Sequence, residues 1–268
     1  MKTFFENFNQ LISRAWERIK PRFKNIAYLL LLEMGIGLVA ALLVGAIFVF
    51  NSGISFVSFM AQGHYNPEML TSMLSTPRMG IAVVLAVVIG LAAMMLYSFV
   101  SLAFLIAIKE DAAVTLKEIL NLSKKKYWAY FGTLFLSGVL IALASLAFVI
   151  PGIILAILYF AVPFIVIETS SINTTALKAS QNLVKNHAWM VTDNLFVWML
   201  LVGLASILLK WLGPVGQLLQ MLVPIFNLAF NYELYLSLKA VSQTETPPTS
   251  TQPENPATPL ESSNSAEA

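Results

Sequence analysis

A repeat in the second half of the chain restricts the possible folds more than any other feature of the sequence. Residues 116–163 align without gaps to residues 177–224, and 16 of the 48 aligned pairs are identical. Leucine-rich segments match one another easily, but several identical pairs here are polar, aromatic or proline. These pairs include Lys117/Lys178, Asn121/Asn182, Lys124/Lys185, Trp128/Trp189 and Pro163/Pro224. Self-similarity at a fixed spacing indicates one structural unit that is used twice.

The composition is that of a membrane protein. Of the 268 residues, 58% are hydrophobic and only 11% are charged, which a soluble domain of this size does not reach. A helix needs about 20 apolar residues to cross the hydrocarbon layer of a membrane. We therefore predict an all-α membrane protein, a six-transmembrane-helix bundle built of three helical hairpins within a membrane domain at 26–240. The predicted spans are 26–50, 81–108, 130–150, 153–168, 192–209 and 215–238.

The positive charges predict the orientation of these spans. Fourteen lysines and arginines fall before the first span, after the last one, or in the loops on that same side, whereas only Arg78 and Lys210 fall on the other side. Basic residues concentrate in cytoplasmic loops, so both termini are expected in the cytoplasm. The two copies of the repeat then enter the membrane from the same side, as a parallel repeat. Each copy begins with an amphipathic segment, which we expect to form an interfacial helix on the cytoplasmic face.

The two ends of the chain differ from the membrane domain. Residues 1–25 form an amphipathic basic arm, which is expected to lie on the membrane surface against anionic headgroups; a solvated arm that only enforces orientation is the alternative. Pro21 is expected to end or kink its helix. Residues 241–268 contain five prolines and no basic residue. They are predicted to be a disordered cytoplasmic tail, with docking of a protein partner as one possible role.

One part of the repeat resembles a known family. The pattern consists of Pro151-Gly152, then Pro163 and Glu168, and then the helical segment 176–189. It is similar to the membrane domain that precedes some bacterial glycerophosphoryl diester phosphodiesterases, and to related uncharacterised six-span inner-membrane proteins. The resemblance implies a multi-pass domain in the bacterial cytoplasmic (inner) membrane. It carries no catalytic residues, because the phosphodiesterase activity belongs to a separate barrel domain for which this chain has no room. The interfacial motif of the pattern comprises Lys178, Ser180, Lys185, His187 and Trp189.

Ionisable and amide side chains at membrane depth are candidates for function, because they are costly there unless paired or hydrated. Glu33, Asn227, Asn231 and Glu233 form a candidate polar groove. In the alternative interpretation, the two glutamates lie near the cytoplasmic interface and are satisfied by basic residues or headgroups, while the asparagines tie helices together.

Pro163 and Pro224 occupy equivalent positions in the two copies of the repeat. They are candidate helix kinks, because an interior proline removes a backbone hydrogen bond. Such kinks either gate a cavity or only shape the bundle.

No recognisable chemistry accompanies these features. The chain has no cysteine, and it shows no facing carboxylate pair, phosphate-binding glycine loop or serine elbow. We therefore expect no enzyme activity, no metal, no cofactor and no nucleic-acid partner. The expected function is that of a non-enzymatic integral inner-membrane protein that associates with lipids or a partner and supports envelope integrity. The alternative is a small transporter or lipid translocator with a polar groove between the repeats, and an intramembrane lipid enzyme ranks third. Whether residues 51–80 enter the outer leaflet stays open.

Overall fold

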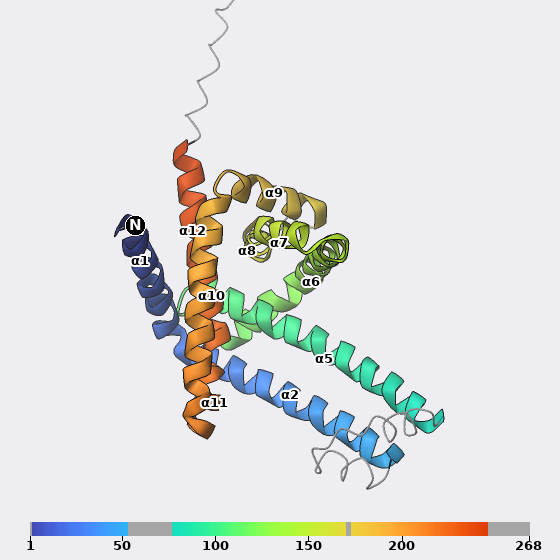
Figure 1. The fold of residues 1–268 in the computed structure, drawn as a ribbon. Coiled ribbons are helices and arrows are strands. Elements are labelled where there is room, and N and C mark those ends of the chain that lie inside the picture. The colour runs from blue at the N-terminus through green and yellow to red at the C-terminus, as the bar shows by residue number, and fades with distance from the viewer. Residues whose placement is uncertain (1, 53–76, 170–172, 246–268) are drawn as a thin grey trace, which may run out of the picture.

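The computed structural model describes residues 2–52, 77–169 and 173–245, and these residues are helical apart from short turns and connections (Figure 1). Segment 53–76 and most of the predicted tail lie outside the described residues. The predicted tail begins at 241, but the last helix continues through Glu245. The elements are α1 (Lys2–Ile19), η1 (Lys20–Arg22), α2 (Phe23–Ser52), α5 (Pro77–Lys109), α6 (Leu116–Ala147), α7 (Val149–Leu158), α8 (Val162–Thr169), α9 (Asn173–Lys185), α10 (Ala188–Trp211), α11 (Gly213–Gln220) and α12 (Val223–Glu245).

Five helical stretches of the described chain are long and apolar enough to cross a membrane, which indicates a multi-pass membrane protein. They are Asn7–Ile47, Gly80–Lys109, Leu116–Ala147, Val149–Thr169 and Ala188–Trp211. The sixth predicted span, 215–238, is helical but interrupted between α11 and α12, and it is not among the five. The count of six spans and the arrangement in three hairpins therefore stay predictions.

Helices α2 and α5 pack against each other and project together away from α10 and α12 (Figure 1). Large apolar side chains on both helices are exposed, including Leu31, Leu42 and Val84, each more than 60% accessible. Apolar surface on this scale is unfavourable in water and is satisfied by lipid. The pair thus has the surface of a membrane hairpin.

The predicted amphipathic arm is helical, but protein covers much of its apolar face. Residues Phe8, Leu11 and Ala15 of α1 are buried. The Phe8 ring packs edge-on against Phe230 of α12, with ring centroids 5.5 Å apart. Pro21 lies in η1, directly after α1 ends, which confirms the predicted break. The arm is therefore docked along α12.

The two copies of the repeat differ at their start. In the first copy, the amphipathic segment and the following span form one continuous helix, α6, which begins with a capping box between Thr115 and Glu118. In the second copy, a turn at Asn186 and His187 separates α9 from α10. The first amphipathic segment is therefore not a separate helix. Lys125 and Lys126 stand where the second copy has Asn186 and His187, and lysine is a better helix former than asparagine or histidine.

The returning limb of each copy is interrupted at an equivalent place. Turns separate α7 from α8 and α11 from α12, and the helices resume at Val162 and Val223, which are aligned in the repeat. Pro163 and Pro224 are the second residues of α8 and α12. At that position a helix does not need the missing N–H. The two prolines thus begin new helices after a break, and they are not kinks inside continuous helices as the sequence suggested.

Glycines allow these limbs to fold back tightly. A Cβ at Gly152 would lie 2.9 Å from the Cβ and 3.0 Å from the Cα of Ser145 in α6. A Cβ at Gly216 would overlap the carbonyl oxygen of Leu209 in α10. Both contacts cross the turn between a span and its returning limb. A larger residue at either position would force the two helices apart.

Candidate functional site

The charged residues of highest interest form a cluster, here called the charged junction, where α1, η1, α5, α8 and α12 meet. The Tyr232 side chain of α12 interacts electrostatically with four charged residues, which are Glu168 of α8, Arg18 of α1, Glu233 of its own helix, and Glu110, which directly follows α5. The junction comprises Arg18, Arg22, Glu110, Glu168, Glu233 and Lys239. Arg18 lies in the amino-terminal arm and Lys239 lies in α12, so the junction joins the first and last helices.

The central contact is an ion pair between Arg18 of α1 and Glu233 of α12, in which the guanidinium Nε donates to the carboxylate. The Glu233 side chain is only 6% accessible, and the Arg18 side chain is 24% accessible. The Arg18 guanidinium also lies over the Tyr232 ring, 5.0 Å from its centroid, a favourable cation–π geometry. Burying a carboxylate this deeply is costly unless a cation pairs with it, so Arg18 compensates Glu233.

Arg22 joins the start of α2 to the end of α5. Its Nε and Nη2 donate to the Glu110 carbonyl oxygen at 2.9 and 2.7 Å, and its Nη1 donates to the Arg18 carbonyl oxygen at 2.6 Å. The Glu110 carbonyl directly follows α5, where backbone carbonyls lack partners within the helix. Burial lowers the pKa of the Arg22 guanidinium, and the neighbouring Arg18 cation lowers it further, while Asp111 acts in the opposite direction.

Glu168, the last acidic residue of α8, forms the third connection. Its Oε2 accepts hydrogen bonds from the Tyr235 hydroxyl at 2.9 Å and from the Lys239 Nζ at 2.6 Å. Both partners lie on α12, so Glu168 links α8 to α12, in the same way that Arg18 links α1 to α12. This pair is more accessible than the first, with side-chain exposures of 14% for Glu168 and 42% for Lys239.

The structure brings only two of the four predicted groove residues together. Asn231 donates through Nδ2 to the Oδ1 of Asn227 at 3.2 Å. That same oxygen accepts the indole N–H of Trp198 in α10 at 2.7 Å. Glu233 is instead part of the charged junction, and Glu33 is half-buried on α2, which packs mainly against α5.

Asn227 and Glu233 also line different cavities, of about 440 Å³ and 240 Å³ respectively. For Glu233 and Asn227, the contacts agree with the alternative interpretation, because a basic residue satisfies the glutamate and the Asn227 amide links α12 to α10, whereas Asn231 bonds within its own helix. Trp198, which stacks on Phe230 at 4.2 Å between ring centroids, makes the link between α10 and α12 and was not identified from the sequence.

The interfacial motif divides into exposed and buried members. Lys178, Lys185 and Trp189 are exposed, and Trp189 is 78% accessible. Ser180 is fully buried, and its hydroxyl donates to the Leu158 carbonyl oxygen at 2.7 Å. This serine therefore fixes α9 to the end of α7, where the helix break leaves a carbonyl without a helical partner, and its side chain is directed into the protein. His187 occupies the N-cap position of α10.

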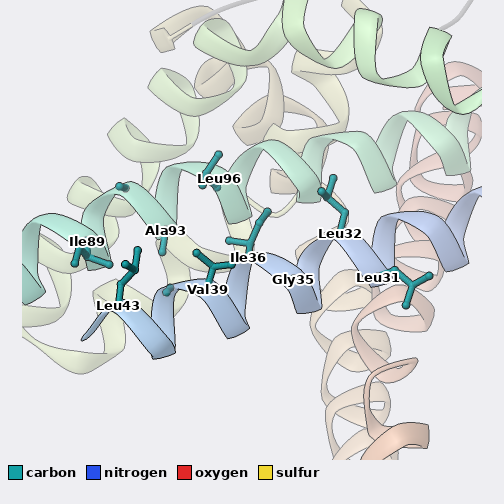
Figure 2. Close-up of a pocket in the computed structure, with 11 residues that line it drawn as sticks. Leu31, Leu32, Gly35, Ile36, Val39, Leu43, Ile89, Ala93 and Leu96 are labelled. Carbon is teal, nitrogen blue, oxygen red and sulfur yellow. The ribbon is translucent and has the colours of Figure 1, made fainter. Parts of the chain in front are cut away.

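An apolar groove runs between α2 and α5 and has a volume of about 480 Å³ (Figure 2). Ile36 and Val39 of α2 point toward α5 in this view. The groove contains no charged or hydrogen-bonding side chain. Its lining residues are Leu31, Leu32, Gly35, Ile36, Val39, Ala40, Leu43, Ile89, Ala92, Ala93 and Leu96. Such a surface fits hydrocarbon, and it offers no group for chemistry.

Within residues 2–52, 77–169 and 173–245, no three histidine or carboxylate side chains are placed to hold a metal ion together. Comparison with protein-family models, with curated proteins and with solved structures gives no match. The charged junction and the apolar helices are therefore the features on which a functional proposal rests.

Proposed function

We propose that the chain is a non-enzymatic integral protein of the bacterial cytoplasmic membrane, similar to the membrane-domain family that its sequence resembles. It associates with membrane lipids, and with a protein partner through its carboxyl-terminal tail, and it supports the integrity of the membrane and envelope. The observation that carries this proposal is that apolar and charged side chains occupy different parts of the protein. Exposed apolar side chains cover the long helices, whereas the linked charges gather at one junction.

The ends of the helices support this assignment. Leu146 and Phe148, where α6 turns into α7, are 83% and 75% accessible, and Trp211 at the end of α10 is 85% accessible. These residues lie at the carboxyl-terminal ends of α6 and α10. Lys126 lies toward the opposite, amino-terminal end of α6, and Lys185 lies just before that of α10. Their exposure is favourable in lipid or at its boundary, where tryptophan is enriched.

The proposed topology has six spans, with α11 and α12 together as the sixth, both termini in the cytoplasm, and parallel repeat hairpins. The equivalent restarts of α8 and α12 at Val162 and Val223 support it. Reporter fusions after Lys125, Lys185 and Glu245 should all report a cytoplasmic location, and a fusion after Lys210 should report the opposite face. Fusions after Lys125 and Lys185 that report opposite faces would refute the parallel repeat.

The cellular role is tested by deleting the gene in the host bacterium. The deletion strain should release more of a soluble periplasmic enzyme under osmotic or detergent stress, and expression of the full chain should restore the wild-type level. Crosslinking in intact cells should recover bound lipid or a specific protein. If deletion leaves the envelope unchanged and crosslinking recovers neither, the proposed role is wrong.

The interrupted returning limbs favour a second candidate, a small transporter or lipid translocator. Discontinuous membrane helices at equivalent repeat positions are typical of transport sites, and α7/α8 and α11/α12 share this feature. Proteoliposomes that contain the purified chain should then move a fluorescent phospholipid between leaflets faster than empty liposomes. If Glu33→Gln and Asn231→Ala leave such movement unchanged, the polar residues have no part in it and this candidate loses its chemical basis.

A further inference from the structure

A cavity of about 240 Å³ opens at the charged junction between α1, η1 and α12. Its lining residues are Arg14, Glu17, Arg18, Arg22 and Glu233. Three guanidinium groups thus face two carboxylates, which leaves one net positive charge. Pockets for drug-sized ligands have volumes of roughly 300–1,000 Å³. This smaller cavity suits a single compact anionic group.

The arginines retain hydrogen-bond donors that the described protein does not use. Arg14 is exposed and has no hydrogen bond or ion pair with the described part of the chain. Arg18 commits its Nε to Glu233, and its terminal amino groups donate to no described residue. A guanidinium fork matches the oxygens of a phosphate group. The cavity therefore presents donors of the kind that phosphate binds.

The Arg18 and Arg22 cations repel each other, and Arg14 lines the same cavity. The three arginines lie four residues apart along the helical arm, a spacing that places side chains on one face. Only Arg18 has a carboxylate partner; Arg22 bonds to two neutral carbonyl oxygens. A bound anion would offset this repulsion.

The surroundings of the cavity favour a lipid over a soluble anion. Trp16 and Phe23, which adjoin Glu17 and Arg22 in the sequence, are 52% and 53% accessible. Exposed aromatic residues beside basic ones are typical of the level of the lipid headgroups. The first apolar span begins at Ile26, one helical turn later. A phosphate held by the arginines would thus lie where a membrane places its own phosphates.

We propose that this cavity binds the phosphate of an anionic phospholipid headgroup, with Arg14 as the main unpaired ligand and Arg18 and Arg22 as its neighbours. The inference rests on the proposed function, because it requires α2 to enter lipid beside the cavity. It adds a defined ligand class and site to that function. Glu17 opposes binding, since its carboxylate lines the same cavity.

The test uses the purified full-length chain in mild detergent and native mass spectrometry, with phosphatidylglycerol, phosphatidylcholine or inorganic phosphate as the ligand. Arg14→Gln should weaken phosphatidylglycerol binding by about tenfold, which corresponds to about 1.4 kcal/mol. Glu17→Gln should strengthen it. Lys20→Gln is the matched control, because Lys20 is an exposed cation of the same arm that does not line the cavity. It should change binding by less than about twofold, as expected for a screened surface charge.

Three results would overturn the inference. Equal losses for Arg14→Gln and Lys20→Gln would indicate diffuse electrostatic attraction and no defined site. Equal binding of phosphatidylcholine would show that the headgroup charge is not recognised. Occupancy by inorganic phosphate as strong as by phosphatidylglycerol would assign the cavity to a soluble anion.

Carbonate extraction of cell membranes separates this inference from the proposed function. If the chain stays in the membrane but does not prefer phosphatidylglycerol, only the lipid site is wrong. If carbonate releases the chain from the membrane, both proposals fail.

Discussion

The ion pair between Arg18 and Glu233 allows a prediction in which the two single substitutions have unequal effects. Exposed ion pairs contribute about 0–1 kcal/mol, whereas removal of one partner of a buried pair costs about 3–5 kcal/mol. The Glu233 side chain is almost fully buried, at 6% accessible, and that of Arg18 is 24% accessible. The partner that remains after each substitution therefore decides the cost.

Arg18→Gln leaves a carboxylate that water barely reaches, and we expect it to lower the free energy of unfolding by about 3 kcal/mol. Glu233→Gln leaves a guanidinium that is accessible enough to be hydrated and that retains an amide oxygen as acceptor. We expect this substitution to cost about 1 kcal/mol. The double variant should cost about 2 kcal/mol less than the sum of the single variants, because the uncompensated charge is absent.

The assay is reversible unfolding in mixed micelles, with sodium dodecyl sulfate as denaturant and tryptophan fluorescence as the signal. Trp16 of α1 stacks on Phe226 of α12, so its emission reports on the contact between these two helices. Lys109→Gln is the matched control, because the Lys109–Glu110 pair has side-chain exposures of 26% and 35% and joins neighbouring residues. It should cost less than about 1 kcal/mol. If Arg18→Gln costs no more than this control, or less than Glu233→Gln, the buried pair does not hold α1 to α12.

Two further predictions concern packing and hydrogen bonding within the repeat. Gly152→Ala should lower the free energy of unfolding by about 1–3 kcal/mol in the same assay, because the new Cβ would meet Ser145. Gly138→Ala, where nothing lies within 4 Å of the added Cβ, should not be destabilising, and equal losses would contradict the close approach. Trp198→Phe keeps an aromatic ring but removes the N–H donor to Asn227, and it should cost about 1 kcal/mol. An unchanged free energy of unfolding would show that this hydrogen bond does not stabilise the contact between α10 and α12.

The local structure of the chain was largely predictable from its sequence. The long apolar runs at 26–50 and 81–108 correspond to α2 and α5, because a helix is the structure that satisfies backbone groups in lipid. The proline at 21 marks the break between the arm and α2. These features depend on residues near one another in the chain, so composition and spacing were sufficient.

The contacts between distant segments were not predictable. Arg18 and Glu233 are 215 positions apart, and one sequence contains no signal that pairs them. The predicted groove placed Glu233 with Asn227 and Asn231 because all three lie on one helix, yet its side chain meets the arm. Ser180 was assigned to the interface from its sequence pattern, although its hydroxyl is needed at the carbonyl of Leu158. In each case the side chain is directed by a partner from another element.

The interruptions of the returning limbs connect the repeat to the charged junction. Before each break the limb is exposed, as Ile150 in α7 and Val215 in α11 show, with 71% and 59% accessibility. After each break the limb is buried, since Ile167 in α8 and Phe230 in α12 are almost inaccessible. An uninterrupted helix keeps one set of side chains on one face, whereas a break lets the second half turn its apolar residues toward the protein.

The buried halves are also the ones that carry the acidic residues of the junction, Glu168 on α8 and Glu233 on α12. Without the breaks, the lipid-facing orientation of α7 and α11 would continue to these carboxylates, where charge is costly. We therefore expect the two prolines to be required for the ion pairs, although neither proline contacts one. Substituting alanine for Pro163 and Pro224 together, which allows each limb to become a continuous helix, should reduce the cost of Arg18→Gln to that of Lys109→Gln. If Arg18→Gln remains as costly in that background, the breaks do not position the junction.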